Sequence, residues 1–334
     1  MKTAKMSFMN RRKFLRNTAG FAAMTILSGD LSAKMIGGFK PGKRLTHLAP
    51  SDVVPIGVIA PFSFRGLPGS AENILQYLLQ LGMRTVELMN APIEQFAGAP
   101  ARPPFEYQRG AQLTPEQQAE MQATRAKYAE DLHIWRMSAP MEKYSELRHM
   151  YEDAGVEIRL VKFDTFTDST SSEEIDYCFN TAKALGARAM TTGLSADKAR
   201  ILGPYADKHR FRVGLHNQEH IDPGEFDKLM TYGNYLGLNF DLGHHVAGSD
   251  IPLTDIIERY QDRMVSLHLT DRKKDNSTLP FGEGDTPLLD VLRFCASRKY
   301  DFGADIDLEY RIPEGSDALK EVGRCRDYCM QAFV

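Results

Sequence analysis

From Pro55 onward, short apolar runs alternate along the chain with longer segments in which apolar residues recur at helical spacing. The short runs predict strands and the longer segments predict helices, because side chains repeat every two residues in a strand and about every 3.6 residues in a helix. The eight predicted strands are "PIGVIAPF" (55–62), "RTVELM" (84–89), "VEIRLVKF" (156–163), "ARAMTTG" (187–193), "RVGLHN" (212–217), "LGLNFD" (236–241), "MVSLHL" (264–269) and "FGADIDLEY" (302–310).

Several of the predicted helices carry recognisable start signals. Ser70 precedes a helical segment, and Thr114 precedes a proline, with Gln117 placed to complete a capping box. Asp222 and Thr286 also stand directly before a proline, the arrangement of a capping residue followed by proline in the first helical turn. These signals support a helix after each strand.

Strictly alternating strands and helices build parallel sheets, and eight such units can close into a barrel. We therefore predict a (β/α)8 TIM barrel over residues 53–334. The alternative is an open doubly wound sheet, but no "GxGxxG" motif follows the first strand. Two long connections, Asn90 to Leu113 and Thr270 to Pro287, both follow strands. They would lie on the face where barrel enzymes keep their active sites.

Composition and charge narrow the class of partner. The chain is 43% hydrophobic and 25% charged, typical of a globular protein. A net charge of -3 provides no basic field of the kind used in sequence-independent nucleic-acid binding. Four cysteines do not make a disulfide scaffold in a chain of 334 residues. A small molecule is therefore a better expectation than a nucleic acid.

The N-terminus has the features of an export signal. Arg11 and Arg12 precede an apolar run over residues 19–27. The pattern predicts a twin-arginine signal peptide over 1–33, a flexible lead-in over 34–52, and a periplasmic location. A basic amphipathic first helix is the alternative. The run is shorter than the about 20 residues that span a bilayer, and no cysteine follows it for lipidation, so we expect no stable membrane anchor.

Four residues that can bind metal end consecutive predicted strands: His216, Asp241, His268 and Glu309 end strands five to eight. Parallel strands in a barrel would bring these side chains to one rim. Two imidazoles and two carboxylates suit a borderline divalent ion, with open positions for water or substrate. Asp307 precedes Glu309 by two residues and shares its face, so it is the alternative for the last position.

The chain resembles the sugar phosphate isomerase/epimerase family, whose members have a xylose-isomerase-like barrel. The motifs that carry the resemblance are "DLGHH" (241–245), "VSLHLTD" (265–271), "FGEGDTPLLDVL" (281–292) and "IDLEY" (306–310), with matching strand order from about 55 to 332. The resemblance implies that Asp241, His268 and Glu309 bind a divalent metal ion, Zn, Mn, Mg, Fe or Co. It also implies that His244 contacts substrate.

The sequence departs from this family at one position. Sugar epimerases of the family usually carry a glutamate where this chain has His216, and that glutamate is both a metal ligand and one of two carboxylates that move the proton. The resemblance therefore leaves the fourth ligand open between His216, Gln218 and Glu219, with His216 preferred. It also places a two-carboxylate epimerase mechanism in doubt.

Further side chains are expected at the same rim. Glu87 ends predicted strand two and Lys162 ends strand three. Lys162 could stabilise an oxyanion, or act as a base if burial lowers its pKa. A lysine held in a salt bridge is the alternative. We expect catalytic roles for Glu309, Lys162 and His244, and substrate contacts from Glu87, Asn217, His244 and Asp271.

Together these features predict a metal-dependent sugar isomerase or epimerase that transfers a proton next to a carbonyl of a sugar or keto-glycoside. One alternative is a lyase that carries out β-elimination on a keto-sugar. Others are a phosphodiester hydrolase resembling the related DNA-repair endonucleases and a sugar-binding barrel without catalysis. A homo-oligomer is compatible with the sequence.

Overall fold

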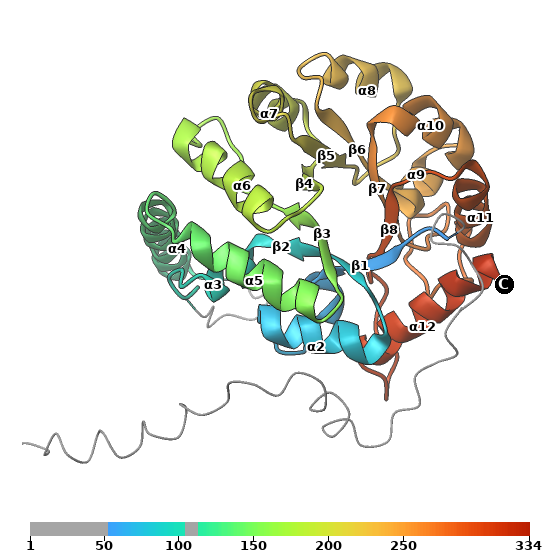
Figure 1. Cartoon of the computed structure of the whole chain (residues 1–334), viewed down its shortest axis with the longest axis horizontal. Coiled ribbons are helices and arrows are strands. Elements are labelled where there is room, and N and C mark those ends of the chain that lie inside the picture. Colours follow the sequence, from blue (N-terminus) through green and yellow to red (C-terminus); the bar gives the residue numbers. More distant parts are fainter. Residues whose placement is uncertain (1–52, 104–112) are drawn as a thin grey trace, which may run out of the picture. The chain divides into compact units, whose positions relative to one another are not determined.

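The computed structural model describes residues 53–103 and 113–334, which all fall within one compact unit, Leu45–Val334. The described residues form a closed barrel of eight parallel strands paired in sequence order, with helices around the outside (Figure 1). The predicted TIM barrel is confirmed. The strands are β1 Ile56–Ala60, β2 Thr85–Met89, β3 Glu157–Lys162, β4 Ala189–Gly193, β5 Arg212–His216, β6 Leu236–Asp241, β7 Met264–Leu269 and β8 Gly303–Ile306. The predicted signal peptide and lead-in lie outside the described residues.

Helices follow each strand, and the connection from β2 to β3 carries three of them. The helices are α2 Ala71–Leu81, α3 Asn90–Phe96, α4 Pro115–Arg136, α5 Met141–Asp153, α6 Ser172–Ala184, α7 Ala196–His209, α8 Pro223–Met230, α9 Leu242–Gly248, α10 Leu253–Tyr260, α11 Leu288–Arg298 and α12 Ala318–Met330. Helix α3 occupies part of a connection that the sequence had suggested was a long loop. Within the described residues, no helix combines the length and apolar character needed to cross a membrane.

Three of the four predicted helix starts are confirmed. Ser70 accepts a hydrogen bond from the backbone of α2, and Asp222 accepts one from the backbone of α8. Thr114 and Gln117 form the complete capping box of α4. The prediction at Thr286 was wrong, because its hydroxyl accepts from Arg272 N at 3.1 Å and α11 begins only at Leu288. Thr286 therefore holds the preceding loop instead of capping the helix.

The barrel interior holds buried polar side chains as well as apolar ones. Most buried apolar side chains pack between the strands and the surrounding helices, whereas Leu160, Ala189 and Val265 form a separate small cluster. Glu87 and Ser266 have no solvent exposure, although both are polar. Ser266 donates to Asp305 Oδ2 at 2.7 Å, and Thr191 donates to Glu87, so each of these buried carboxylates has a hydrogen-bond donor. A polar site can therefore lie directly on the barrel interior.

Strand β8 ends earlier than the sequence predicted, at Ile306 instead of Tyr310. The hydroxyl of Ser63 donates to Ile306 O at 3.2 Å and accepts from Leu308 N at 3.1 Å. The Ser63 hydroxyl thus bonds to backbone groups that β1 would otherwise pair with, and the hydrogen bonding between β1 and β8 stops there. Asp307 N still donates to Leu269 O at 3.1 Å, so Asp307 stays at the rim while Glu309 lies beyond it.

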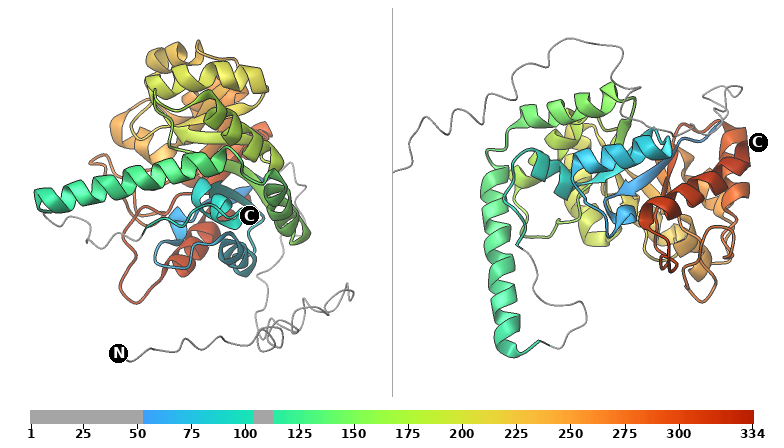
Figure 2. Two further views of the ribbon diagram at one scale, coloured as in Figure 1. Left: turned by 90° about the vertical axis from the view of Figure 1, so that its left-hand side faces the viewer. Right: turned by 90° about the horizontal axis from the view of Figure 1, so that it is seen from below.

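Helix α4 is an addition to the ring of helices that surrounds the barrel. It has 22 residues, and the buried ones are Leu132 and Arg136, both near its C-terminal end. Figure 2 shows α4 extending past the other helices. Its buried residues thus lie in its last turns, where it packs against α6 and where Arg136 bonds to Glu94 of α3.

Candidate metal centre

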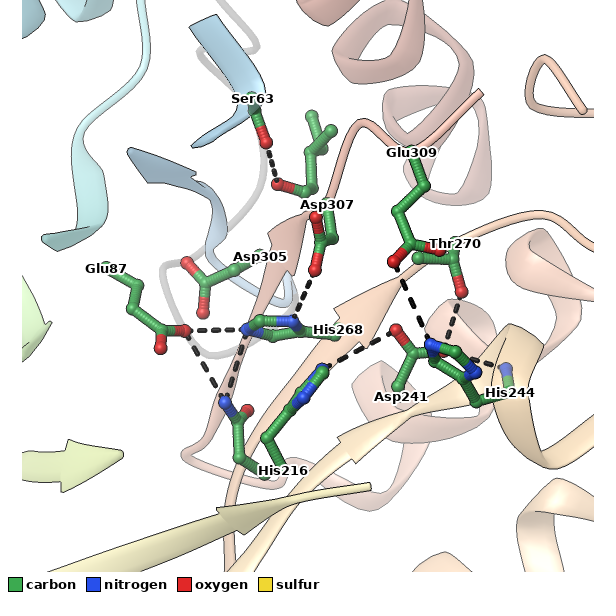
Figure 3. Close-up of polar contacts among 12 residues, drawn as sticks. Ser63, Glu87, His216, Asp241, His244, His268, Thr270, Asp305, Asp307 and Glu309 are labelled. Atoms are coloured by element: carbon green, nitrogen blue, oxygen red, sulfur yellow. Dashed lines mark hydrogen bonds and ion pairs between the residues drawn. The ribbon is translucent and has the colours of Figure 1, made fainter. Parts of the chain in front are cut away.

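Four buried side chains meet at the C-terminal rim of the barrel. Each of His216, Asp241, His268 and Asp307 offers one atom able to bind a metal ion, and these atoms all lie within 4.8 Å of one another. Figure 3 shows the four side chains converging from the ends of β5, β6 and β7 and from the residue that follows β8. We call these four residues the metal cluster.

His268 is held between two carboxylates. Its Nε2 lies 2.7 Å from Glu87 Oε2, and its Nδ1 lies 3.1 Å from Asp307 Oδ2. Burial alone would lower the pKa of His268, but Glu87 and then Asp307 raise it well above its usual value. Histidines that bind metal commonly donate their other ring N–H to a carboxylate, which fixes the tautomer and strengthens the ligand. Glu87 stands in that position, with Nδ1 left to face Asp307.

His216 is a buried imidazole without a hydrogen bond. Neither of its ring nitrogens has a partner, and Nε2 lies 3.7 Å from Asp241 Oδ2. Burial lowers the pKa of His216, with the nearby His268 adding to the effect. A neutral imidazole has a lone pair available, which is the form that binds metal.

Asp241 presents one oxygen to the cluster and uses the other for support. Its Oδ1 accepts from Thr270 Oγ1 at 2.6 Å and from His244 N at 2.8 Å, as the N-cap of α9. Its Oδ2 is buried without a partner. Burial would raise the pKa of Asp241, but His216 and His244 hold it at about 2, so the carboxylate is charged.

A bound metal ion would provide a partner for the buried polar atoms of the metal cluster that make no hydrogen bond. Among the described residues, His216, Asp241 Oδ2 and Asp307 Oδ1 are buried polar atoms without a hydrogen bond. A buried polar group without a partner costs about 1–3 kcal/mol, so several together call for an explanation. Two imidazoles and two carboxylates fit zinc, manganese, iron or cobalt better than calcium, which prefers oxygen ligands alone.

Glu309, expected from the sequence as the last ligand, lies outside the metal cluster. Its Oε2 is paired with Arg272, and its Oε1 lies 3.8 Å from His244 Nε2. Arg272 Nη2 lies 3.2 Å from the same His244 nitrogen. The structure thus brings Asp307 into the cluster, the alternative noted in the sequence, and forms a neighbouring group of Arg272, Glu309 and His244.

Lys162, Gln218 and Glu219 were also expected near the metal cluster, and the structure places them in different surroundings. Lys162 is buried near Glu87, and its charge contributes, after His268, to holding the pKa of Glu87 low against the effect of burial. Gln218 and Glu219, the alternatives to His216, are exposed. The other two expected residues are Asn217 and Asp271.

Asn217 and Asp271 have their polar atoms occupied by the backbone. Asn217 Oδ1 accepts from Asp241 N at 2.7 Å, and its amide donates to two carbonyl groups. Asp271 accepts from Gly282 N at 2.7 Å, Gly284 N at 3.1 Å and Thr286 N at 3.2 Å. Both were expected to contact substrate. In this geometry they hold the β6 rim and the 271–286 loop in place.

Sequence reasoning missed two supporting groups. Thr270, which orients Asp241, follows His268 by two residues, so strand alternation could have placed both at the same rim. The role of Glu87 behind His268 had no local signal, because the two residues are 181 positions apart.

Comparison with known proteins shows relatives at the level of the fold. No model of a known protein family matches the chain, and a search of curated proteins found no match. The chain is similar to a solved structure described as the probable 3-DHS dehydratase AsbF of Bacillus anthracis, with 11% identity, a TM-score of 0.55 and coverage of 83% of this chain and 98% of that one.

Two further structures have the same barrel. A xylose isomerase domain protein from Alicyclobacillus acidocaldarius has 14% identity and a TM-score of 0.55, with coverage of 83% of this chain and 99% of that one. A sugar phosphate isomerase/epimerase from Parabacteroides distasonis has 14% identity and a TM-score of 0.53, with coverage of 86% and 96%. The fold of this chain is that of the xylose-isomerase-like TIM barrels, in agreement with the resemblance seen in the sequence.

Proposed function

We propose that the protein is a divalent-metal-dependent enzyme that moves a proton next to a carbonyl of a small carbohydrate. The observation that carries the proposal is the metal cluster, in which His216, Asp241 and Asp307 present unpartnered buried atoms at the rim. The likeness to a sugar phosphate isomerase/epimerase and to a dehydratase supports a sugar-like substrate and proton transfer as the reaction.

A bound divalent ion would act as a Lewis acid toward the substrate carbonyl and a neighbouring hydroxyl, making the adjacent C–H more acidic. His216, Asp241, His268 and Asp307 would hold the ion, and Glu87 and Thr270 would orient two of these ligands. The chain's own contribution to the reaction is then to position the sugar and to accept and return the proton.

Side chains able to transfer a proton or stabilise charge lie on both sides of the metal cluster. In Figure 3, Glu87 lies on one side of His268, and His244 and Glu309 lie on the other. Lys162, at the end of β3 and paired in register with Met89 of β2, is on the Glu87 side. We propose that Glu309 removes the proton, steadied by Arg272, and that Lys162 stabilises the negative charge that develops on the substrate oxygen.

The family's usual second carboxylate is replaced by His216, and Glu87 is engaged with His268. Glu309 is partly open to solvent, with 20% of its side chain exposed, whereas Asp241 and Asp307 are buried. A single base favours isomerisation or β-elimination over inversion, which needs proton delivery to the opposite face. The product therefore decides between an isomerase and a lyase.

The experiment is to load the protein with zinc, manganese or cobalt, incubate it with keto-sugars in heavy water, and follow deuterium exchange and product by NMR. Glu309→Gln should slow exchange by roughly 10²- to 10⁴-fold at equal metal occupancy. Exchange that does not depend on metal, or no turnover of any sugar by the metal-loaded protein, would contradict the proposal. Rapid inversion at a single carbon would contradict the single-base mechanism.

A further inference from the structure

A cavity with polar and apolar walls lies beside the barrel rim, outside the metal cluster. Its volume is about 1010 Å³, and it is lined by residues of α3, α4 and the loop that joins β3 to α6. Asn90 follows β2 directly, and Thr165 comes shortly after β3, so the cavity is on the face where the strands end. None of the four residues of the metal cluster lines it. We call it the α4 cavity.

The floor of the α4 cavity is a closed network of charges. Arg136 donates through Nε to Glu94 Oε1 at 2.7 Å and through Nη1 to Glu174 Oε1 at 2.5 Å. The side chain of Arg136 is 2% exposed and that of Glu94 is 4% exposed. Tyr177 OH and Asn90 Nδ2 also donate to Glu94, so its carboxylate has no free position. Arg136 is thus paired with two carboxylates, so this part of the cavity wall does not attract an anionic ligand.

Other groups at the wall have hydrogen-bonding capacity to spare. His133 Nδ1 lies 3.1 Å from Glu174 Oε2, whereas its Nε2 makes no hydrogen bond to any described residue. Within the described residues, the hydroxyl of Tyr128 and Oδ1 of Asn90 have none either. Neutral donors and acceptors that are preformed and unused suit a ligand rich in hydroxyl groups.

Apolar rings line the same cavity as these polar groups. Tyr128 contributes an aromatic ring, and Pro100 and Pro103 contribute proline rings to the same cavity. A sugar ring has the matching combination of an apolar C–H face and an edge of hydroxyl groups. Pockets for small ligands usually measure roughly 300–1,000 Å³. The α4 cavity is at the top of this range and so has room for more than a single small ring.

We propose that the α4 cavity binds a neutral second sugar of a glycoside whose reacting ring lies at the metal cluster. The placement of the reacting ring rests on the proposed function, whereas the sugar specificity of the cavity rests on its own residues. The substrate is then a disaccharide or a larger glycoside instead of a free monosaccharide. Helix α4 is the part of the chain that provides this extension of the binding surface.

The test is calorimetric titration of metal-loaded protein with cellobiose, maltose and lactose, compared with glucose and galactose. At least one disaccharide should bind roughly tenfold more tightly than either monosaccharide. Tyr128→Ala removes the aromatic wall, and Ala129→Trp fills the cavity from an exposed helix position, so both should abolish that preference. Glu130→Ala, on α4 but outside the cavity, is the matched control and should retain it.

The same titrations on Asp307→Asn protein separate this proposal from the proposed function. A disaccharide preference that persists there and disappears in Tyr128→Ala supports the cavity as a sugar subsite, even if no sugar is turned over. No preference for any disaccharide, or a preference unchanged in both cavity variants, would overturn it. Sedimentation would also overturn it if a dimer without disaccharide preference dissociated in Ala129→Trp, because a second copy would then occupy the cavity.

Discussion

Asp307 and Glu309 lie two residues apart, yet their carboxylates have different surroundings. Asp307 Oδ1 is buried without a partner beside His268, whereas Glu309 is paired with Arg272. We expect Asp307→Asn to lose most of the bound metal, because it removes a charged ligand. Glu309→Gln should keep close to the wild-type amount while losing activity. Elemental analysis of the two purified variants compares these positions directly.

The opposite result would identify a different ligand set. Normal metal content in Asp307→Asn together with metal-poor Glu309→Gln would mean that the chain after β8 rearranges to bring Glu309 into the cluster. Circular dichroism of both variants provides the control for folding, since each change preserves the size of the side chain.

Glu87 would influence a bound ion through His268 and would not contact the ion itself. It accepts the hydrogen bond of His268 Nε2 and is supported by Thr191. Removing such a carboxylate typically lowers metal affinity 10- to 100-fold, because the histidine becomes a weaker and less fixed ligand. We expect that range for Glu87→Gln, measured by competition with a chelator. The exposed Glu130→Gln serves as control, and equal affinities in both variants would show that His268 does not depend on Glu87.

Helix α7 shows at the scale of an element how close packing can outweigh helix propensity. Gly203 lies inside this helix, and a Cβ added there would come 2.2 Å from Tyr232 O. Alanine would improve helix propensity by about 1 kcal/mol. A backbone contact this short must be relieved by movement, and overpacking of this kind costs about 1–3 kcal/mol. We therefore expect Gly203→Ala to lower the melting temperature by several degrees.

Gly323 in α12 is the matched comparison. A Cβ added there would meet Leu81 Cδ2 at 3.2 Å, the tip of a side chain that can turn away. Gly323→Ala should therefore be neutral or slightly stabilising, because the gain in helix propensity remains. Calorimetric scans of both variants test the pair. An equal loss of stability in the two would mean that contact with backbone is not the deciding factor.

The element pattern could be predicted from the sequence because each buried strand is a short, nearly continuous apolar run. The choice between Asp307 and Glu309 could not be predicted, because alternation along the predicted strand 302–310 places both on the same face. The end of β8 decides between them, and Ser63, 245 residues before Leu308, sets that end. The start of α4 carried a clear capping signal, but nothing in its sequence indicated the cavity that it forms with α3 and the β3–α6 loop.

At the scale of the whole molecule, the paired arginines near the N-terminus predict export of the chain through the twin-arginine route. The double change Arg11→Lys with Arg12→Lys should keep the protein in the cytoplasm, because this route requires the arginine pair. Arg16→Lys, just outside the pair, should not. Fractionation followed by immunoblotting measures the distribution. Periplasmic protein at the wild-type level in the double variant would exclude this signal.

The contact between Glu87 and His268 has a consequence for where the ion is acquired. The two residues are 181 positions apart and meet only when the barrel has closed, so the metal cluster does not exist in the unfolded chain. A protein exported in the folded state would have its cluster complete before it crosses the membrane. The barrel would then bind its ion in the cytoplasm and keep it during export. The metal content of the exported protein would reflect the metals available in the cytoplasm, not those of the compartment that it reaches.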